Sequence, residues 1–195
     1  DWDAVLKETL AAFGQIDILV NNAGIFERGT VLDTSLAMFE KTMDINVTGV
    51  FLGMKTVAPH MVQRKTGSIV NISSVDGLLP CMGTGYDTAK AAVIQFTRSL
   101  AVDLAPHDIR VNNIAPGAVM VETLRKMHAG ELPPLWPSDT EPTGLMNPIT
   151  KIRSNNIPLR RRGTPDDIAN AVMFFVGEGA SWVSGQILSV DGGRS

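Results

Sequence analysis

The sequence predicts an α/β protein with a doubly wound, mainly parallel β-sheet and helices on both faces, in a three-layer α/β/α arrangement. Short apolar runs alternate with longer amphipathic segments along the chain, and strands that alternate with helices are joined by right-handed crossovers. Polar or turn-forming residues follow three of the apolar runs, where parallel strands form a ligand crevice. The 195 residues suffice for a single domain spanning 1–195.

The first part of the chain predicts a helix, a strand and a long helix. Residues 3–13 carry apolar side chains at helical spacing, and Ile16–Val20 is a short apolar run typical of a buried strand. Thr34 or Ser35 can cap a helical segment that continues to about Lys65.

The remainder continues the alternation. Tyr86–Leu104 has apolar residues three and four apart, which predicts a helix. Thr164 followed by Pro165 and two aspartates is a helix start, and that helix should reach about Gly177. Residues 120–160 are rich in proline and predict a loop with short helices, which we interpret as a lid. The remaining strands are expected at Ser68–Ile72, Ile109–Ala115 and Gln186–Val190.

Composition excludes several classes of protein. The formal net charge of −3 gives no basic surface for nucleic acid or an anionic membrane. No apolar run approaches the roughly 20 residues that span a bilayer, and we expect no signal peptide, because Asp1-Trp2-Asp3 has neither a basic nor an apolar region. Cys81 is the single cysteine, so no internal disulfide forms, and we expect a cytoplasmic protein. The three histidines lie far apart, so no metal site is expected.

Three polar residues suggest proton-transfer chemistry. Tyr86 and Lys90 lie four residues apart on a predicted helix and so share a face. An ammonium group close to a phenol lowers its pKa, and a tyrosine tuned in this way can give a proton to a forming alkoxide or take one from an alcohol. Ser74 could bind the same substrate oxygen. Each of these features also occurs as an ordinary helix pair or turn, and it is their order and spacing together that favours a site.

Six motifs in order resemble the short-chain dehydrogenase/reductase family. The sequence Asn21-Asn22-Ala23-Gly24 after the first strand looks like the family's NNAG motif, and Asn46 matches its helix asparagine. Ser74 takes the place of the active-site serine, and Tyr86 with Lys90 matches the YxxxK motif. The two remaining motifs are the strand and turn from Arg110 to Gly117 and the closing segment from Ser184 to Gly193.

The resemblance implies a Rossmann-like fold, NAD or NADP as cofactor, and interconversion of a secondary alcohol and a ketone by hydride transfer. Tyr86 would be the general acid/base, Ser74 would orient the substrate oxygen, and Lys90 would lower the Tyr86 pKa and hold the nicotinamide ribose. Asn46 would hold a water that links Lys90 to solvent, although an amide bonded to local backbone is the alternative. The residues expected to contact the cofactor are Asn21, Asn22, Ala23, Gly24, Tyr86, Lys90, Pro116, Gly117 and Val119.

Two departures from the family pattern stand out. Val121 occupies a position where the family often has a threonine that touches the cofactor. The glycine-rich turn that seats the pyrophosphate does not precede the first helix, so we expect an N-terminally truncated domain that lacks about 60 residues. Such a chain should expose strand edges, and we expect it to be poorly stable or prone to aggregate when alone.

Alternatives to this function are a non-catalytic fragment that cannot hold the cofactor, and an isomerase or dehydratase on the same fold. Enoyl reductase is disfavoured because that branch spaces its tyrosine and lysine more widely. The resemblance implies a homotetramer or dimer built through the helices around residues 40–64 and 86–104 and the last strand. The predicted lid is rich in apolar residues, which favours a hydrophobic or cyclic substrate, although these side chains could equally pack the lid onto the body.

Overall fold

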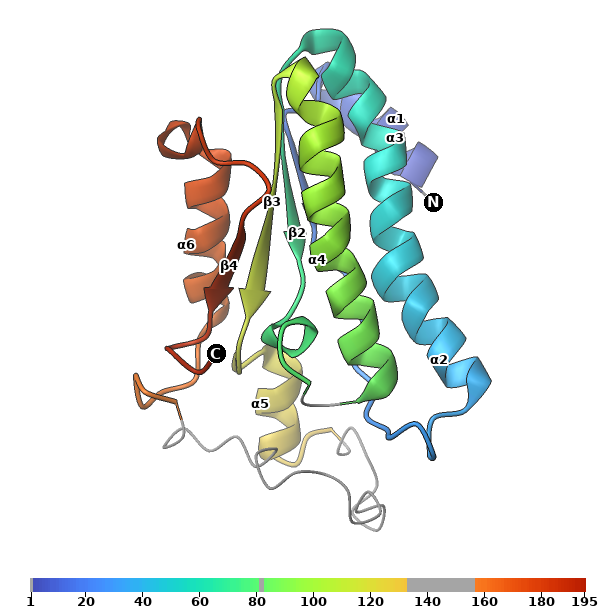
Figure 1. Cartoon of the computed structure of the whole chain (residues 1–195), viewed down its shortest axis with the longest axis vertical. Helices are drawn as coiled ribbons and strands as arrows, with labels where there is room; N and C mark the ends of the chain where they lie inside the picture. The colour runs from blue at the N-terminus through green and yellow to red at the C-terminus, as the bar shows by residue number, and fades with distance from the viewer. Residues whose placement is uncertain (1, 81–82, 133–156) are drawn as a thin grey trace.

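A parallel sheet of four strands forms the middle layer of the molecule (Figure 1). The computed structural model describes residues 2–80, 83–132 and 157–195. Within these residues the strands lie side by side in chain order, so each crossover moves one place in the same direction. They are β1 (Ile18–Asn21), β2 (Gly67–Ile72), β3 (Ile109–Pro116) and β4 (Ile187–Val190).

Helices cover both faces of this sheet, as Figure 1 shows. One face carries α1 (Trp2–Phe13), α3 (Gly49–Arg64) and α4 (Thr84–Leu104), and the other carries α6 (Pro165–Val176). The predicted doubly wound, three-layer α/β/α fold is therefore confirmed. The shorter elements are α2 (Leu36–Met43), a π-helix (Asp44–Thr48), α5 (Glu122–His128) and the 3-10 turns η2 (Val75–Gly77), η3 (Ala105–His107) and η6 (Glu178–Ala180).

Each face of the sheet has its own apolar core. Met54, Met61 and Val93 are buried against the face covered by α3 and α4. Phe175 of α6, which is 2% exposed, belongs to a smaller apolar cluster between α6 and the other face of the sheet. Burial of these side chains on both faces explains why the strands read as continuous apolar runs.

Most of the predicted elements agree with the structure to within one or two residues. The first strand is shifted, because it begins at Ile18 rather than Ile16 and includes Asn21. The long helical segment is capped by Ser35, whose hydroxyl accepts a hydrogen bond from the Met38 amide, and is interrupted by the π-helix. Residues 133–156 of the predicted lid lie outside the described residues, as does Cys81.

The β1 strand forms one edge of the sheet and pairs with β2 in the described parts of the chain. Its apolar side chains Ile18 and Val20 are 46% and 38% exposed. A strand edge with exposed apolar residues is a template for further pairing, in keeping with the expected tendency of the chain to aggregate.

The start of α6 offers a test of local stability. The Thr164 hydroxyl accepts a hydrogen bond from the Asp167 amide, and the Asp167 carboxylate accepts one from the Thr164 amide, which completes a capping box. Thr164→Ala should lower the free energy of unfolding by about 1 kcal/mol in urea denaturation. Thr48→Ala is the matched control, because Thr48 makes no capping hydrogen bond at the start of α3 and should cost far less. Equal losses in the two variants would contradict a stabilising role for the capping box.

Candidate active site

The predicted site residues meet at the carboxyl edge of the sheet. Asn21 ends β1, Ser74 follows β2 by two residues, and Pro116 ends β3. The amino-terminal end of α4 brings Tyr86 to the same edge and Lys90 follows one helical turn later. Parallel strands place their carboxyl ends together, and this is why residues far apart in the sequence converge here.

Ser74 and Tyr86 form the centre of the site. Ser74 is buried, and its hydroxyl accepts a hydrogen bond from the Asp76 amide at 3.1 Å. Its side chain also lies close enough to the Tyr86 phenol to lower the pKa of that group. The Tyr86 ring is half-buried and meets the ring of Phe26 edge-on, with ring centroids 4.9 Å apart. Ser74 and Tyr86 therefore lie close together at the edge of the sheet.

Burial dominates the electrostatics of Tyr86. Desolvation raises the pKa of Tyr86 to about 12, the hydrogen bond from Ser74 acts in the opposite direction, and the carboxylates of Asp76 and Asp87 raise the pKa further. The phenol is thus protonated at neutral pH. This differs from the expectation that Lys90 holds the Tyr86 pKa down. The Lys90 ammonium lies 5.6 Å from the ring centroid and donates its hydrogen bond elsewhere.

Lys90 carries a buried positive charge. Its side chain is 5% exposed, and Nζ donates to the carbonyl oxygen of Ile72 at 3.1 Å. Burial lowers the pKa of Lys90 to about 8, because the charged form loses its hydration. The ammonium is mostly charged at neutral pH and is anchored to the last residue of β2.

Asn46 lies inside the π-helix and is fully buried. Its Nδ2 donates to the carbonyl oxygens of Ile25 and Thr42, at 2.9 and 3.0 Å. Its Oδ1 is buried and has no hydrogen-bond partner among the described residues. The alternative of an amide bonded to local backbone thus accounts for the nitrogen but leaves the oxygen available, as a water-holding role would require.

Gly24 joins this cluster through its lack of a side chain. A Cβ at Gly24 would stand 2.6 Å from Asn46 Oδ1 and 3.3 Å from Lys90 Nζ. The backbone that follows β1 therefore passes directly over both polar groups. The structure brings together Gly24, Asn46 and Lys90, which the sequence placed in three separate motifs.

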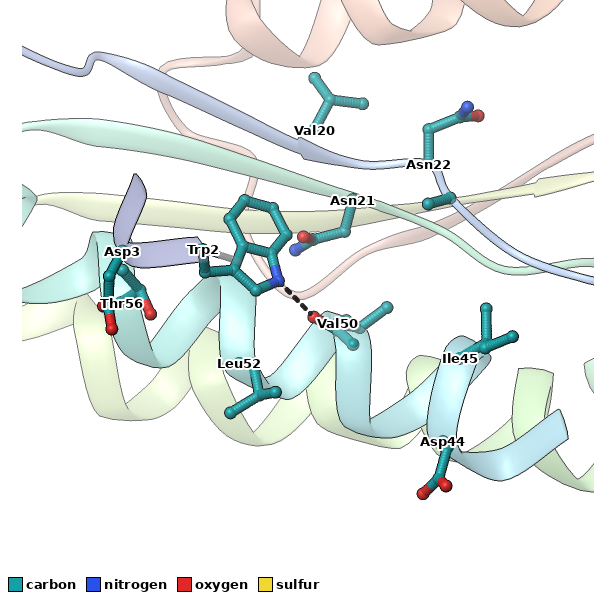
Figure 2. A pocket seen from close by; sticks show the side chains of 12 residues that line it. Trp2, Asp3, Val20, Asn21, Asn22, Asp44, Ile45, Val50, Leu52 and Thr56 are labelled. Carbon is teal, nitrogen blue, oxygen red and sulfur yellow. Dashed lines mark hydrogen bonds between the residues drawn. The ribbon is translucent and has the colours of Figure 1, made fainter. Parts of the chain in front are cut away.

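A cavity of about 560 Å³ opens beside the end of β1 (Figure 2). It is lined by Asn21, Asn22 and Ala23 from the predicted cofactor motif, and its other walls come from the start of α1, the π-helix and the first part of α3. Its size lies within the range of cofactor and ligand sites. The Asn21 side chain is committed to the sheet, because its Nδ2 donates to Asn71 Oδ1 at 2.8 Å.

The segment after β3 is held by short backbone contacts. The Gly117 amide donates to the Val190 carbonyl, and a Cβ at Gly117 would stand 2.5 Å from Asp191 Cβ. Val119 forms an isolated bridge with Gly163 in which the bonds use Ala118 O and Met120 N. The N–H and C=O of Val119 itself therefore point away from this bridge, since backbone groups alternate along an extended chain.

Three features around the site were not predicted from the sequence. Asn71, Asn113 and Thr97 form a buried polar network, in which Asn71 Nδ2 donates to Thr97 Oγ1 at 3.0 Å. Ser73 extends it, because its hydroxyl donates to Asn113 Oδ1 at 2.5 Å. Asparagine is depleted in strands, so its presence in two predicted apolar strands was the available signal. The close approach of Gly77 to the backbone of α4, and the edge-on contact of Phe26 with Tyr86, leave no comparable signal in the sequence.

Within the described ranges, no cluster of three or more possible metal ligands occurs, and no helix is long and apolar enough to cross a membrane.

Comparisons with known proteins define the family. A family model described as "Enoyl-(Acyl carrier protein) reductase" matches residues 1–195. The chain is 40% identical over 196 residues to 2-(R)-hydroxypropyl-CoM dehydrogenase of Xanthobacter autotrophicus, and the match covers 98% of this chain and 72% of that protein. It is 36% identical over 193 residues to a 3-oxoacyl-(acyl-carrier-protein) reductase of a Synechocystis species, and this match covers 98% of this chain and 70% of that protein.

A solved structure described as ElxO with NADP bound has a TM-score of 0.83 and 31% sequence identity, and covers 99% of this chain and 73% of that chain. The chain therefore belongs to the short-chain dehydrogenase/reductase family. It is an oxidoreductase of a family that uses NAD or NADP. The predicted family, enzyme class and cofactor class are confirmed.

The buried charge of Lys90 predicts a pH-dependent stability. The folded chain releases the Lys90 proton near pH 8, whereas the unfolded chain keeps it to about the ordinary value of 10.5. In this window the unfolded state binds more protons, so the free energy of unfolding should increase as pH rises from 8 to 10.5, by up to about 3 kcal/mol.

Lys90→Met removes this titration, so urea denaturation of the variant should lack the increase that the wild type shows. Replacement of the exposed Lys55 by methionine is the matched control and should retain the increase. Parallel curves for the wild type and Lys90→Met would show that the buried ammonium is not the cause.

Proposed function

We propose that this chain interconverts a secondary alcohol and a ketone, with Tyr86 as the general acid/base. The observation that carries the proposal is the meeting of Ser74 and Tyr86 at the carboxyl edge of the sheet, where the serine side chain acts on the phenol, with the buried Lys90 ammonium one helical turn away. The relatives named as a dehydrogenase of a hydroxypropyl compound and as a 3-oxoacyl reductase support this reaction class. The spacing of four between Tyr86 and Lys90 argues against enoyl reductase chemistry.

Tyr86 is suited to act as the acid in the reductive direction. Its phenol is protonated at neutral pH, so it can give its proton to the oxygen of a carbonyl group as that oxygen gains negative charge. Ser74 would donate a hydrogen bond to the same oxygen and orient it. In the oxidative direction the phenolate is needed, so we expect the rate of alcohol oxidation to rise with pH.

The cofactor NAD(P)H would supply the hydride, because no side chain can do so. Asn21, Asn22, Ala23 and Gly24 would face its adenosine side, and the fit is supported by the cavity that the first three of these residues line. Pro116, Gly117 and the outward-facing backbone of Val119 would hold the nicotinamide amide.

Lys90 and Asn46 would complete the proton path. Lys90 would hold the ribose hydroxyls of the cofactor. Asn46 Oδ1, which is buried with no partner among the described residues, would accept a hydrogen bond from a water that connects Lys90 to solvent.

We further propose a hydrophobic substrate, a cytoplasmic location and a homo-oligomer. Met120 and Leu124 of the described part of the lid are half-buried apolar side chains, and they follow Gly117 and Val119 closely in the sequence. Phe51 on α3 and Val102 on α4 are 45% and 74% exposed, which supports an interface built through these helices.

Binding of the cofactor tests the proposal without knowledge of the substrate. Trp2 lines the cavity, so bound NADPH or NADH should quench tryptophan fluorescence and accept energy from it. We expect saturable binding of one of the two, with micromolar affinity. A chain that is folded by circular dichroism but binds neither would favour the alternative of a non-catalytic fragment.

Tyr86→Phe tests the catalytic assignment. Loss of the phenol oxygen should reduce ketone reduction by roughly 10²- to 10⁴-fold, because proton transfer is lost, and should leave the affinity for NADPH unchanged. NADPH oxidation is followed with a panel of ketones that includes cyclohexanone and ethyl acetoacetate. Thr9→Ala, which removes an exposed hydroxyl on α1, is the control and should turn over as the wild type does. Full turnover by Tyr86→Phe would refute the assignment.

A further inference from the structure

The turn that follows Ser74 lies in direct contact with the backbone of α4. A Cβ at Gly77 would stand 2.6 Å from the carbonyl carbon of Lys90, 2.7 Å from the Ala91 nitrogen and 2.9 Å from the Lys90 oxygen. These are helix backbone atoms, which cannot turn aside as the end of a flexible side chain can. The φ of Gly77 lies outside the left-handed region, so space alone requires glycine at this position.

This contact closes a small unit that contains the proposed proton-transfer groups. Ser74 caps η2 by accepting a hydrogen bond from the Asp76 amide, and the Gly77 amide donates to the Ser74 carbonyl at 3.0 Å. Ser74 is therefore rigidly connected to Gly77. On the other side of the contact, Lys90 lies one helical turn after Tyr86. The Ser74 side chain acts on the phenol of this tyrosine and lowers its pKa.

The separation between the turn and the helix thus sets the separation between the serine hydroxyl and the phenol. Carbon atoms in contact prefer about 3.5 Å or more, so a methyl group at Gly77 would push the turn from α4 by roughly 1 Å. A displacement of that size is enough to break a hydrogen bond, which weakens steeply with distance.

We propose that Gly77 is a positioning residue, which holds the Ser74 side chain beside the Tyr86 phenol by docking the η2 turn directly on the backbone of α4. The inference rests on the proposed function for its catalytic meaning. Its geometric content can be tested with no substrate and no turnover.

The test uses the fact that Tyr86 is the only tyrosine of the chain. Replacement of tyrosine by 3-fluorotyrosine gives one ¹⁹F resonance, and the fluorine shifts the phenol titration to lower pH, where the pKa can be measured by NMR. Ser74→Ala should raise this pKa by about one unit, the size expected for loss of one hydrogen bond to the phenolate. The comparison is made in the Asp76→Asn background, because the Asp76 carboxylate moves with the same turn and also acts on the Tyr86 pKa. There Gly77→Ala should raise the pKa by a similar amount, and should add nothing further when Ser74→Ala is also present.

Two further variants make the result decisive. Gly179→Ala is the matched control, because a Cβ there meets no atom within 4 Å, and it should leave the pKa unchanged. Val75→Ala loosens the same turn by removing buried methyl groups without a clash, and should shift the pKa in the same direction only when Ser74 is present. It decides the question if Gly77→Ala does not fold.

An unchanged pKa in folded Gly77→Ala or, where that variant does not fold, in Val75→Ala would overturn the proposal. Shifts that add to that of Ser74→Ala would also overturn it, because they would show that Gly77 acts independently of Ser74. Failure of the proposed function would instead appear as absent turnover with the predicted ¹⁹F shifts intact.

Discussion

The hydrogen bond from the buried Lys90 ammonium to the carbonyl of Ile72 is the constraint on which the site depends. A charge buried to this extent is costly unless it is well bonded, and here it fixes α4 at the end of β2. The same helix carries Tyr86, and Ser74 follows Ile72 by two residues, so this contact fixes the helix of the proposed acid at the end of the strand that leads to its partner. The low pKa of Lys90 and the high pKa of Tyr86 are both consequences of this burial.

The sheet is joined to the site by polar as well as apolar packing. Asn21, Asn71 and Asn113 occupy paired positions on three neighbouring strands, and hydrogen bonds link Asn21 to Asn71 and connect both Asn71 and Asn113 to Thr97 on α4. Buried amides that hydrogen-bond one another favour a single register, because a slip would break these bonds. This network holds the ends of the strands, where the candidate site lies, in one arrangement relative to α4.

Alternating apolar runs predicted the layers of the fold, because strands that are buried on both faces are apolar along most of their length. Motifs at strand ends predicted the meeting of Ser74, Tyr86 and Lys90 for the same reason. The sequence could not show that burial would raise the Tyr86 pKa, because desolvation depends on what covers the ring, such as Phe26. Nor could it show the close contacts at Gly77 and Gly24, since a close approach between two segments leaves no periodic pattern in the sequence.

Hydride transfer to a carbonyl carbon is the reaction proposed for this site. The most direct measurement is isotope transfer from NADPH deuterated at C4 of the nicotinamide to a ketone reduced by the chain, followed by mass spectrometry and NMR of the alcohol. We expect one deuterium on the carbinol carbon with the wild type, on a single face, and none above background with Tyr86→Phe. Reduction in which deuterium is absent from that carbon, or is incorporated equally well by Tyr86→Phe, would contradict hydride transfer with Tyr86 as the acid.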